Sequence, residues 1–348
     1  MTAMASSTRP PRALAAVPRP CAALQVCSID DVFVSAMQSG SFDARVHSVF
    51  DRVINLERTS GGLFTLAARG MDNAPLTAIV GLPGVGAAGI AVGDPVVAID
   101  GGLRVGDGFV LHFATASIWR AWLPSYPPAP ERLAGQLRAA RSILARQGVH
   151  GGMAVQAGAA GGFALEVATA LEQRSKRLIE ALAQARHADA CRHAVSMLGL
   201  GPGLTPSGDD FLVGLFAILN VADSPCQGWL DGGAQVLLQA EHATNAISLA
   251  ALTAAAGGRV RESIAALIGS LLHGTPATLV QPLSRVLAIG ATSGADLVAG
   301  ILAGLELNLQ VEATRSAESA LPRCVSTQRH GVPHDAAAST PIATGATC

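Results

Sequence analysis

A segment between residues 198 and 214 carries the residue types best suited to binding an anion. Four glycines, two prolines and two hydroxyl side chains stand there before an apolar helical run. A loop of this composition at a helix start leaves backbone N–H groups unpaired at the positive end of the helix dipole, which suits a phosphate or a carboxylate. We therefore expect the substrate contacts to include Gly201, Gly203, Thr205, Ser207 and Gly208.

The same segment also fits a purely structural role. Ser207 and Asp210 have the spacing of a capping box, and Pro206 with the glycines would then only shape a tight helix start. The segment is not a Walker A motif, since no Gly-Lys-Ser/Thr follows, and it is not a dinucleotide fingerprint, since a helix precedes it. Both the anion site and the structural role stay open at this point.

A second copy of the local pattern follows 86 residues later. Residues 293–300 repeat the S-G-x-D-x-x-x-G spacing of residues 207–214. Two equivalent helix starts predict an internal pseudo-repeat whose N-termini enclose a ligand. Ser293 and Gly294 would then join the substrate contacts, and the catalytic acceptors would be Asp209, Asp210 and Asp296. A duplicated capping device explains the repeat equally well.

The three aspartates conflict with a pure anion pocket, because carboxylates repel a phosphate. A substrate with both NH₂ donors and an anionic group resolves the conflict, and so does a Mg²⁺ ion that bridges carboxylate and phosphate. No other cofactor is expected, and the histidines lack metal-ligand spacing. Further candidates for the cleft are the sparse polar residues of the helical region, Glu241, His242, Asn245, Arg259, Arg261 and Glu262, with Asn245 and Arg259 preferred as substrate contacts.

The composition excludes several classes of function. Among 348 residues, 24 Lys plus Arg stand against 25 Asp plus Glu, so there is no electrostatic basis for non-specific nucleic-acid binding. Lys176 is the only lysine, which excludes lysine-based chemistry elsewhere. The six cysteines form no C-x-x-C pair, which argues against zinc and disulfide scaffolds. Without a secretory signal or an uninterrupted membrane-spanning run, we expect a cytoplasmic protein without membrane contact.

Changes in texture along the chain predict an α+β protein. Residues 1–22 and 312–348 are expected to be disordered tails, and a proline-rich linker at 124–130 separates two regions. Short apolar runs with regular turn signals between 23 and 123 predict a small antiparallel, barrel-like β domain. Apolar residues at three- and four-residue spacing predict a helical domain over 131–311. Its helices are expected at 131–147, 165–198, 209–221, 233–256, 260–272, 278–289 and 294–307.

Residues 198–214 and 293–305 together resemble the signature of a bacterial family that includes the AllH-type subunit of oxamate carbamoyltransferase. A looser resemblance covers residues 25–310, including the runs 46–50 and 54–56. The resemblance implies reversible carbamoyl transfer between oxalurate and phosphate in allantoin and purine catabolism, giving oxamate and carbamoyl phosphate. It also implies partner subunits similar to acyl-CoA synthetase chains.

On that resemblance, the glycine loop and Ser207 would hold the phosphate and an arginine would neutralise developing charge. Asp210 and Asp296 would orient the carbamoyl NH₂. Two other functions stay open from the sequence, a non-catalytic scaffold subunit and a protein that binds a small anion without turnover.

Overall fold

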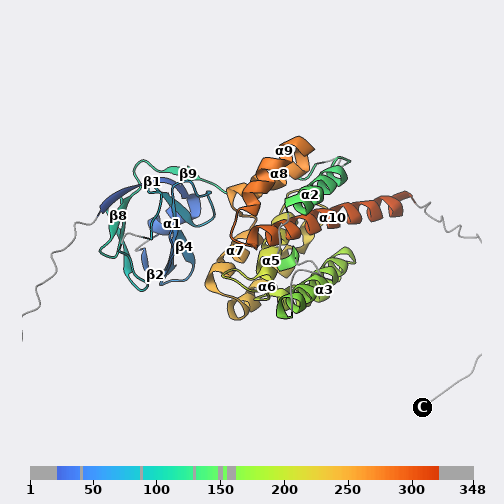
Figure 1. The fold of residues 1–348 in the computed structure, drawn as a ribbon, viewed down its shortest axis with the longest axis horizontal. Coiled ribbons are helices and arrows are strands. Elements are labelled where there is room, and N and C mark those ends of the chain that lie inside the picture. The colour runs from blue at the N-terminus through green and yellow to red at the C-terminus, as the bar shows by residue number, and fades with distance from the viewer. Residues whose placement is uncertain are drawn as a thin grey trace, which may run out of the picture.

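The computed structural model describes residues 22–39, 42–86, 89–127, 131–147, 152–154 and 162–320. A β domain and a helical domain lie side by side (Figure 1). Residues 1–21 and 321–348 of the expected tails lie outside the described residues, as do residues 128–130 of the expected linker. The C-terminal expectation needs one correction, because the last helix continues through residue 312 and ends at Ala320.

The N-terminal domain is a closed barrel. Its strands are β1 (Ala22–Asp30), β2 (Asp43–Val49), β3 (Val53–Arg58), β4 (Leu63–Ala68), β5 (Thr77–Val80), β6 (Pro95–Ile99), β7 (Gly102–Val105), β8 (Phe109–His112) and β9 (Ser117–Trp119). The order β5-β4-β3-β2-β6-β7-β8-β1 closes through a β1–β5 pairing, and β9 adds to β1. The pairings β1–β8, β1–β9 and β4–β5 are parallel, which turn spacing alone does not reveal.

A short helix that the sequence analysis did not anticipate packs against the barrel core. Helix α1 (Asp31–Gln38) follows β1 directly and buries Phe33 completely. The Phe33 ring lies 5.6 Å from the ring of Phe42 and 4.8 Å from that of Phe64, centroid to centroid. These three rings belong to 3 of the 13 aromatic residues of the chain, and all three are part of the barrel core.

The helical domain contains α2 (Leu133–Gln147), α3 (Phe163–Ala183), α4 (His187–Met197), α5 (Ser207–Leu219), α6 (Leu230–Ala243), α7 (Ala246–Ala256), α8 (Glu262–His273), α9 (Pro276–Leu287) and α10 (Ser293–Ala320). Two single helices expected from periodicity are each two helices. The expected helix 165–198 breaks where Ala185 adopts a φ of 52°. The expected helix 233–256 breaks at Asn245, whose side chain caps α7.

Helices α5 and α10 form the centre of this domain and cross at two glycines. A Cβ on Gly214 would collide with the carbonyl of Leu297, and a Cβ on Gly300 would collide with the carbonyl of Phe211. Both pairs are related by the 86-residue repeat, so each helix makes the same close approach to the other. The sequence repeat is therefore a structural repeat with approximate twofold symmetry.

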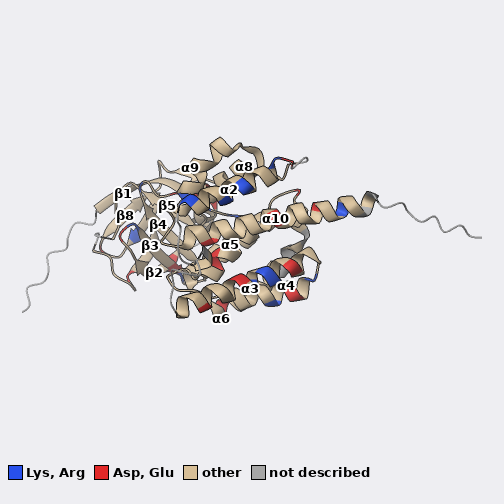
Figure 2. Cartoon of the chain, turned by 45° about the vertical axis from the view of Figure 1, so that its right-hand side comes forward, with Lys and Arg blue, Asp and Glu red and all other residues tan. Residues whose placement is uncertain are grey.

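Helix α10 is a core helix of the domain. Residues 293–317 are the one segment among the described residues that is long and apolar enough to cross a membrane, but 67% of its most apolar window is buried inside the fold. The C-terminal end extends beyond the other helices (Figure 1). Charged side chains are sparse along α5 and α10 and gather on α3 and α4 instead (Figure 2). This distribution follows from burial, since charges inside a helical core are costly.

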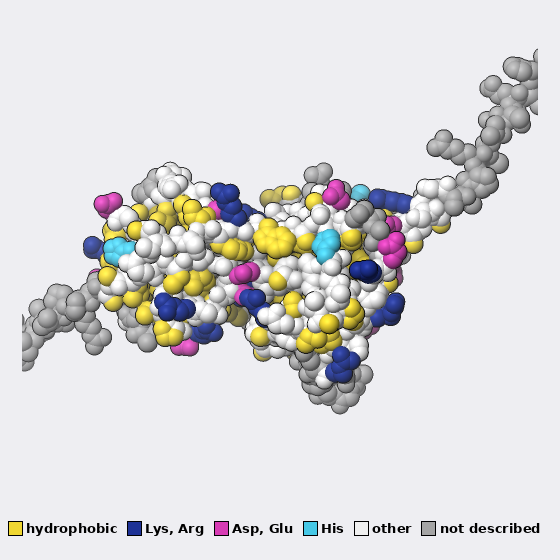
Figure 3. Space-filling model, turned by 90° about the horizontal axis from the view of Figure 1, so that it is seen from above, with side chains coloured by type: hydrophobic (Ala, Val, Ile, Leu, Met, Phe, Trp, Pro, Cys, Tyr) yellow, Lys and Arg dark blue, Asp and Glu magenta, His cyan; other side chains and the backbone are white. Residues whose placement is uncertain are grey.

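Polar contacts join the two domains. Arg259, which follows α7, reaches Asp30 at 2.6 Å and Asp31 at 2.5 Å at the end of β1. Asn73 of the barrel donates to Glu262 at 3.1 Å, and Arg285 of α9 pairs with Asp72 at 2.5 Å. Figure 3 shows acidic and basic side chains next to each other where the domains meet. These contacts fix the barrel against the helix starts of the second domain.

Candidate functional site

A cleft of about 1000 Å³ lies between the barrel and the helical domain. The barrel contributes mainly apolar side chains from β3, β4 and the segment that precedes β5. The helical domain contributes the loop before α5, the start of α10 and the segment between α7 and α8. The polar residues that decide its chemistry are Asp51, Arg52, Asn55, Thr65, Asp72, Thr77, Thr205, Asp210, Arg259, Arg261, Arg285, Thr292 and Ser293.

The loop before α5 forms one wall of this cleft. Gly199, Gly201 and Gly203 have φ values of 68°, 119° and 110°, a region that favours glycine. A Cβ on Gly201 would lie 2.8 Å from the backbone nitrogen of Ser207, so the loop turns back closely onto the start of α5. Gly203 and Thr205 line the cleft, whereas Gly201 does not. The glycines thus bring the loop backbone against the helix N-terminus, as the composition predicted.

Gly208 and Gly294 have a packing role and do not line the cleft. A Cβ on Gly208 would collide with the carbonyl of Met197, and one on Gly294 would collide with the carbonyl of Val286. The two residues occupy equivalent positions in the repeat. The start of α5 therefore packs closely against the end of α4, and the start of α10 packs closely against the end of α9. Their expected contact with substrate is corrected to this close backbone approach.

Asp209 binds the loop before α5 on the side away from the cleft. Its Oδ1 accepts a hydrogen bond from the Gly199 N–H at 2.9 Å, and its Oδ2 accepts one from the Thr244 hydroxyl. The side chain is 1% exposed and is not part of the cleft wall. Burial raises the pKa of Asp209, and these hydrogen bonds oppose the rise. The expected catalytic role of Asp209 is therefore replaced by a positioning role, since both oxygens are bound to the protein.

Asp210 is the aspartate of the repeat that faces the cleft. Its Oδ2 lies 3.0 Å from the Thr205 hydroxyl, which is itself 2.7 Å from the Ser293 hydroxyl of α10. Burial raises the pKa of Asp210 to about 7, and the negative charges of Asp296 and Asp209 act in the same direction. Hydrogen bonds from Ser293 and Thr205 oppose the rise. A carboxyl with this pKa changes protonation near neutral pH.

Asp296 occupies the equivalent position on α10 but is turned away from the cleft. The residue is 0% exposed, and its Oδ1 accepts a hydrogen bond from the Met153 N–H at 2.7 Å. Burial raises its pKa to about 6, and the nearby Ser207 and Thr292 hydroxyls lower it in part. Asp296 does not line the cleft and its Oδ2 has no hydrogen-bond partner among the described residues, so its expected substrate contact stays a prediction.

The capping-box alternative does not describe the start of α5. The N-cap position is Pro206, and no side chain accepts a capping hydrogen bond there. Ser207 lies inside the first turn and is 0% exposed, and its hydroxyl has no hydrogen-bond partner among the described residues. Ser207 does not line the cleft, and its expected phosphate contact stays a prediction. Ser293, its repeat mate, is the hydroxyl that reaches the cleft.

Arg259 and Arg261 share the segment between α7 and α8 but have different surroundings. Both line the cleft. The Arg259 guanidinium is bound by two aspartates of the barrel, so it acts as a clamp between the domains. Among the described residues the Arg261 guanidinium has no hydrogen-bond or ion-pair partner, and the negative charges of Asp72 and Asp210 favour its charged form. Burial lowers its pKa, yet a guanidinium stays charged.

The sequence did not distinguish these two arginines. Both belonged to the sparse charged residues expected near the cleft, and Arg259 was preferred as the substrate contact. The signal that separates them is the pair of aspartates at the end of β1, which lies more than two hundred residues away in the chain. In the structure the Arg259 guanidinium is engaged by the barrel, and its expected substrate contact stays a prediction.

The other expected residues lie outside the cleft wall. Asn245 caps α7 and donates to the Leu204 carbonyl at 2.8 Å, so it supports the loop. Glu241 and His242 are exposed on α6, and Glu262 accepts the hydrogen bond from Asn73. No group of three His, Cys, Asp or Glu side chains within the described ranges is arranged to hold a metal ion.

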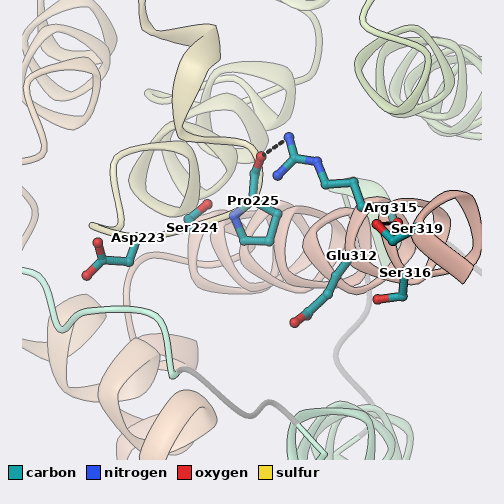
Figure 4. Close-up of a pocket in the computed structure, with 7 residues that line it drawn as sticks. All are labelled: Asp223, Ser224, Pro225, Glu312, Arg315, Ser316 and Ser319. Carbon is teal, nitrogen blue, oxygen red and sulfur yellow. Dashed lines mark hydrogen bonds between the residues drawn. The ribbon is translucent and has the colours of Figure 1, made fainter.

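A second hollow of about 660 Å³ lies on the outside of the helical domain, near the C-terminal end of α10. Figure 4 shows its lining residues, with Arg315 donating a hydrogen bond of 3.1 Å to the Pro225 carbonyl. Its remaining lining residues are Asp223, Ser224, Glu312, Ser316 and Ser319. None of the residues singled out by the sequence reaches this hollow, so the interdomain cleft is the candidate site.

Comparison with protein families agrees with this division of the chain. The model of the AllH family N-terminal domain matches residues 25–118, which are the barrel. The model of the oxamate carbamoyltransferase subunit AllH matches residues 197–305, which run from the glycine loop to α10 and include most of the cleft residues of the helical domain. No solved structure matches the chain. With both family models matched over most of the folded chain, this protein belongs to the family of the oxamate carbamoyltransferase subunit AllH.

Proposed function

We propose that this subunit binds the substrates of carbamoyl transfer in its interdomain cleft. In the proposed reaction, a phosphate oxygen attacks the carbamoyl carbon of oxalurate and the bond from that carbon to the oxamate nitrogen breaks. The proton lost by the phosphate hydroxyl is balanced by the proton that the departing nitrogen gains. The products are carbamoyl phosphate and oxamate, and the reaction runs in both directions.

The observation that carries this proposal is that Arg261 and Asp210 line the same cleft. Arg261 supplies an anion-facing cation without a protein partner among the described residues, and Asp210 supplies a carboxyl at the joined N-termini of α5 and α10. A substrate that carries both an anion and an NH₂ group satisfies both charges. Such positioning, together with electrostatic stabilisation, is sufficient for group transfer without a covalent enzyme intermediate.

The dipoles of α5 and α10 support the same assignment. Thr205 and Ser293 are in hydrogen-bond contact, so the positive ends of the two helices meet at one place on the cleft wall. The positive ends of these helix dipoles and the Arg261 guanidinium favour a phosphate or a carboxylate. Asp210 would repel that anion when ionised, which a Mg²⁺ ion between them would relieve. The Mg²⁺ dependence of binding is for that reason part of the test.

Partner subunits complete the proposal. The family name describes a subunit, so other chains of the enzyme are plausible. We propose that they resemble acyl-CoA synthetase chains and act with this subunit in the cytoplasm, in purine catabolism. Co-purification of the natively expressed chain, followed by mass spectrometry of the bound proteins, tests this part independently of ligand binding.

The direct test is calorimetric titration of the full chain with carbamoyl phosphate, inorganic phosphate and oxamate, each with and without Mg²⁺. Arg261→Gln removes the cation and should weaken phosphate binding at least about tenfold, a loss of about 1.4 kcal/mol. Arg104→Gln is the matched control, because Arg104 is exposed on β7 of the barrel and outside the cleft. If Arg261→Gln binds all three ligands as tightly as the unaltered chain, the cleft assignment is wrong.

A further inference from the structure

The internal repeat places two aspartates in equivalent positions with different surroundings. Asp210 and Asp296 are 86 residues apart, as are Ser207 and Ser293. At Asp210, the Thr205 hydroxyl donates at 3.0 Å and lies 2.7 Å from the Ser293 hydroxyl of the other copy. At Asp296, the Ser207 hydroxyl and the carboxyl Oδ2 have no hydrogen-bond partner among the described residues. The two sites therefore contain equivalent residues in different contacts.

A backbone contact further distinguishes the two sites. In the second copy the N–H of Met153 donates to Asp296 at 2.7 Å. Gly152 lies so close that a Cβ on it would collide with both carboxyl oxygens of Asp296. The backbone amide of this segment therefore lies directly against the carboxylate. In the first copy, Asp210 has the hydroxyl partners and faces the interdomain cleft.

We infer that Asp210 accepts an N–H from the amide group of a bound substrate, as Asp296 accepts the N–H of Met153. Asp210 is then the residue that selects a carbamoyl group over acyl groups of the same shape. The inference rests on the proposed function, since it assigns the cleft to a carbamoyl substrate and adds how the NH₂ group is recognised. It also explains why two equivalent aspartates are not both substrate contacts, because the protein's own chain occupies the position at Asp296.

Carbamoyl and acetyl groups can be distinguished because a methyl group has no N–H hydrogen to donate. Acetyl phosphate has the shape of carbamoyl phosphate with CH₃ in place of NH₂. Its methyl group offers no hydrogen to the Asp210 carboxylate, so a buried charge would lose its partner on binding. Sites built to hydrogen-bond a substrate NH group reject the analogue that lacks it far more strongly than apolar sites reject a size change. We expect the unaltered chain to bind carbamoyl phosphate at least about tenfold more tightly than acetyl phosphate.

The experiment measures both dissociation constants by calorimetry, with freshly dissolved ligands and the full chain. Asp210→Leu removes the acceptor and should bring the preference for carbamoyl phosphate close to one. Asp210→Asn keeps a neutral acceptor oxygen and should give an intermediate preference. Asp107→Asn is the matched charge control, since Asp107 is exposed in the barrel, and it should retain the full preference. Thermal melting of each variant shows that it is folded.

Failure of this inference is distinguishable from failure of the proposed function. If the unaltered chain binds both acyl phosphates equally, the cleft still binds phosphate but Asp210 does not read the NH₂ group. If Asp210→Leu keeps the tenfold preference, the recognition belongs to another residue. If neither ligand binds and Arg261→Gln changes nothing, the cleft assignment itself is wrong, and the inference fails with it.

Discussion

Replacing Asp210 with Asn should make the folded protein more stable at pH 8. Asp210 is 7% exposed, and burial is the main reason that its pKa is raised to about 7. The ionised carboxylate is therefore less stable in the folded chain than in the unfolded chain. Asparagine has the same shape and no charge, and its oxygen can still accept the hydrogen bond from Thr205.

The size and sign of the effect follow from linkage. A rise from the ordinary value of 3.8 to about 7 corresponds to about 4 kcal/mol, at about 1.4 kcal/mol for each pKa unit. Because the pKa of Asp210 is higher in the folded chain than in the unfolded chain, the protonated carboxyl favours folding. This contribution to the free energy of unfolding is fully present below about pH 4 and is lost as pH rises through about 7. Besides burial, the negative charges of Asp296 and Asp209 raise the pKa of Asp210, and the Arg261 guanidinium is the cation on which the charge of Asp210 acts. Allowing for imperfect fit of the amide, we expect Asp210→Asn to gain about 2–4 kcal/mol at pH 8.

The assay is chemical denaturation of the unaltered chain and of Asp210→Asn between pH 5 and 8, with Asp107→Asn as the control for loss of an exposed charge. The two stability curves should separate as pH rises and approach each other near pH 5. The reasoning is refuted if Asp210→Asn is less stable than the unaltered chain at pH 8, or if the difference between them does not change with pH. A stabilised variant that also binds substrate weakly would show that the buried charge is kept for function at the expense of stability.

Other predictions concern the elements that position the site. Gly300→Ala places a methyl group against a carbonyl of α5 and should lower the free energy of unfolding by about 2–3 kcal/mol, while Gly269→Ala, which has open space around its Cα, should not. Arg259→Ala leaves Asp30 buried without its cation and should cost about 3 kcal/mol, seen in denaturation as earlier loss of barrel signals; an unchanged midpoint would contradict the clamp. Asn245→Ala removes the cap of α7 and should cost about 1 kcal/mol by thermal melting, with weaker phosphate binding by calorimetry if the loop loses its support; unchanged melting would argue against the cap.

The fold class and the position of the glycine loop could be predicted because both depend on local features. Alternation of apolar runs with turn residues marks the barrel, and glycines that need a positive φ mark the loop before α5. Parallel pairing of β1 with β8 and the short helix α1 could not be read in this way. Both depend on which strands meet when the barrel closes, and periodicity along the chain contains no information about that.

By itself the sequence determined that two equivalent helix starts carry aspartates and serines, since a repeat of 86 residues is visible without a structure. Only the tertiary structure decided that Asp210 faces the cleft while its neighbour Asp209 faces the loop. Successive residues on an α-helix point about 100° apart, so the packing of α5 against α10 selects which carboxylate is presented. Docking of the barrel likewise decided the surroundings of two nearby arginines that both line the cleft. Among the described residues, aspartates of the barrel bind the Arg259 guanidinium, whereas they do not bind that of Arg261.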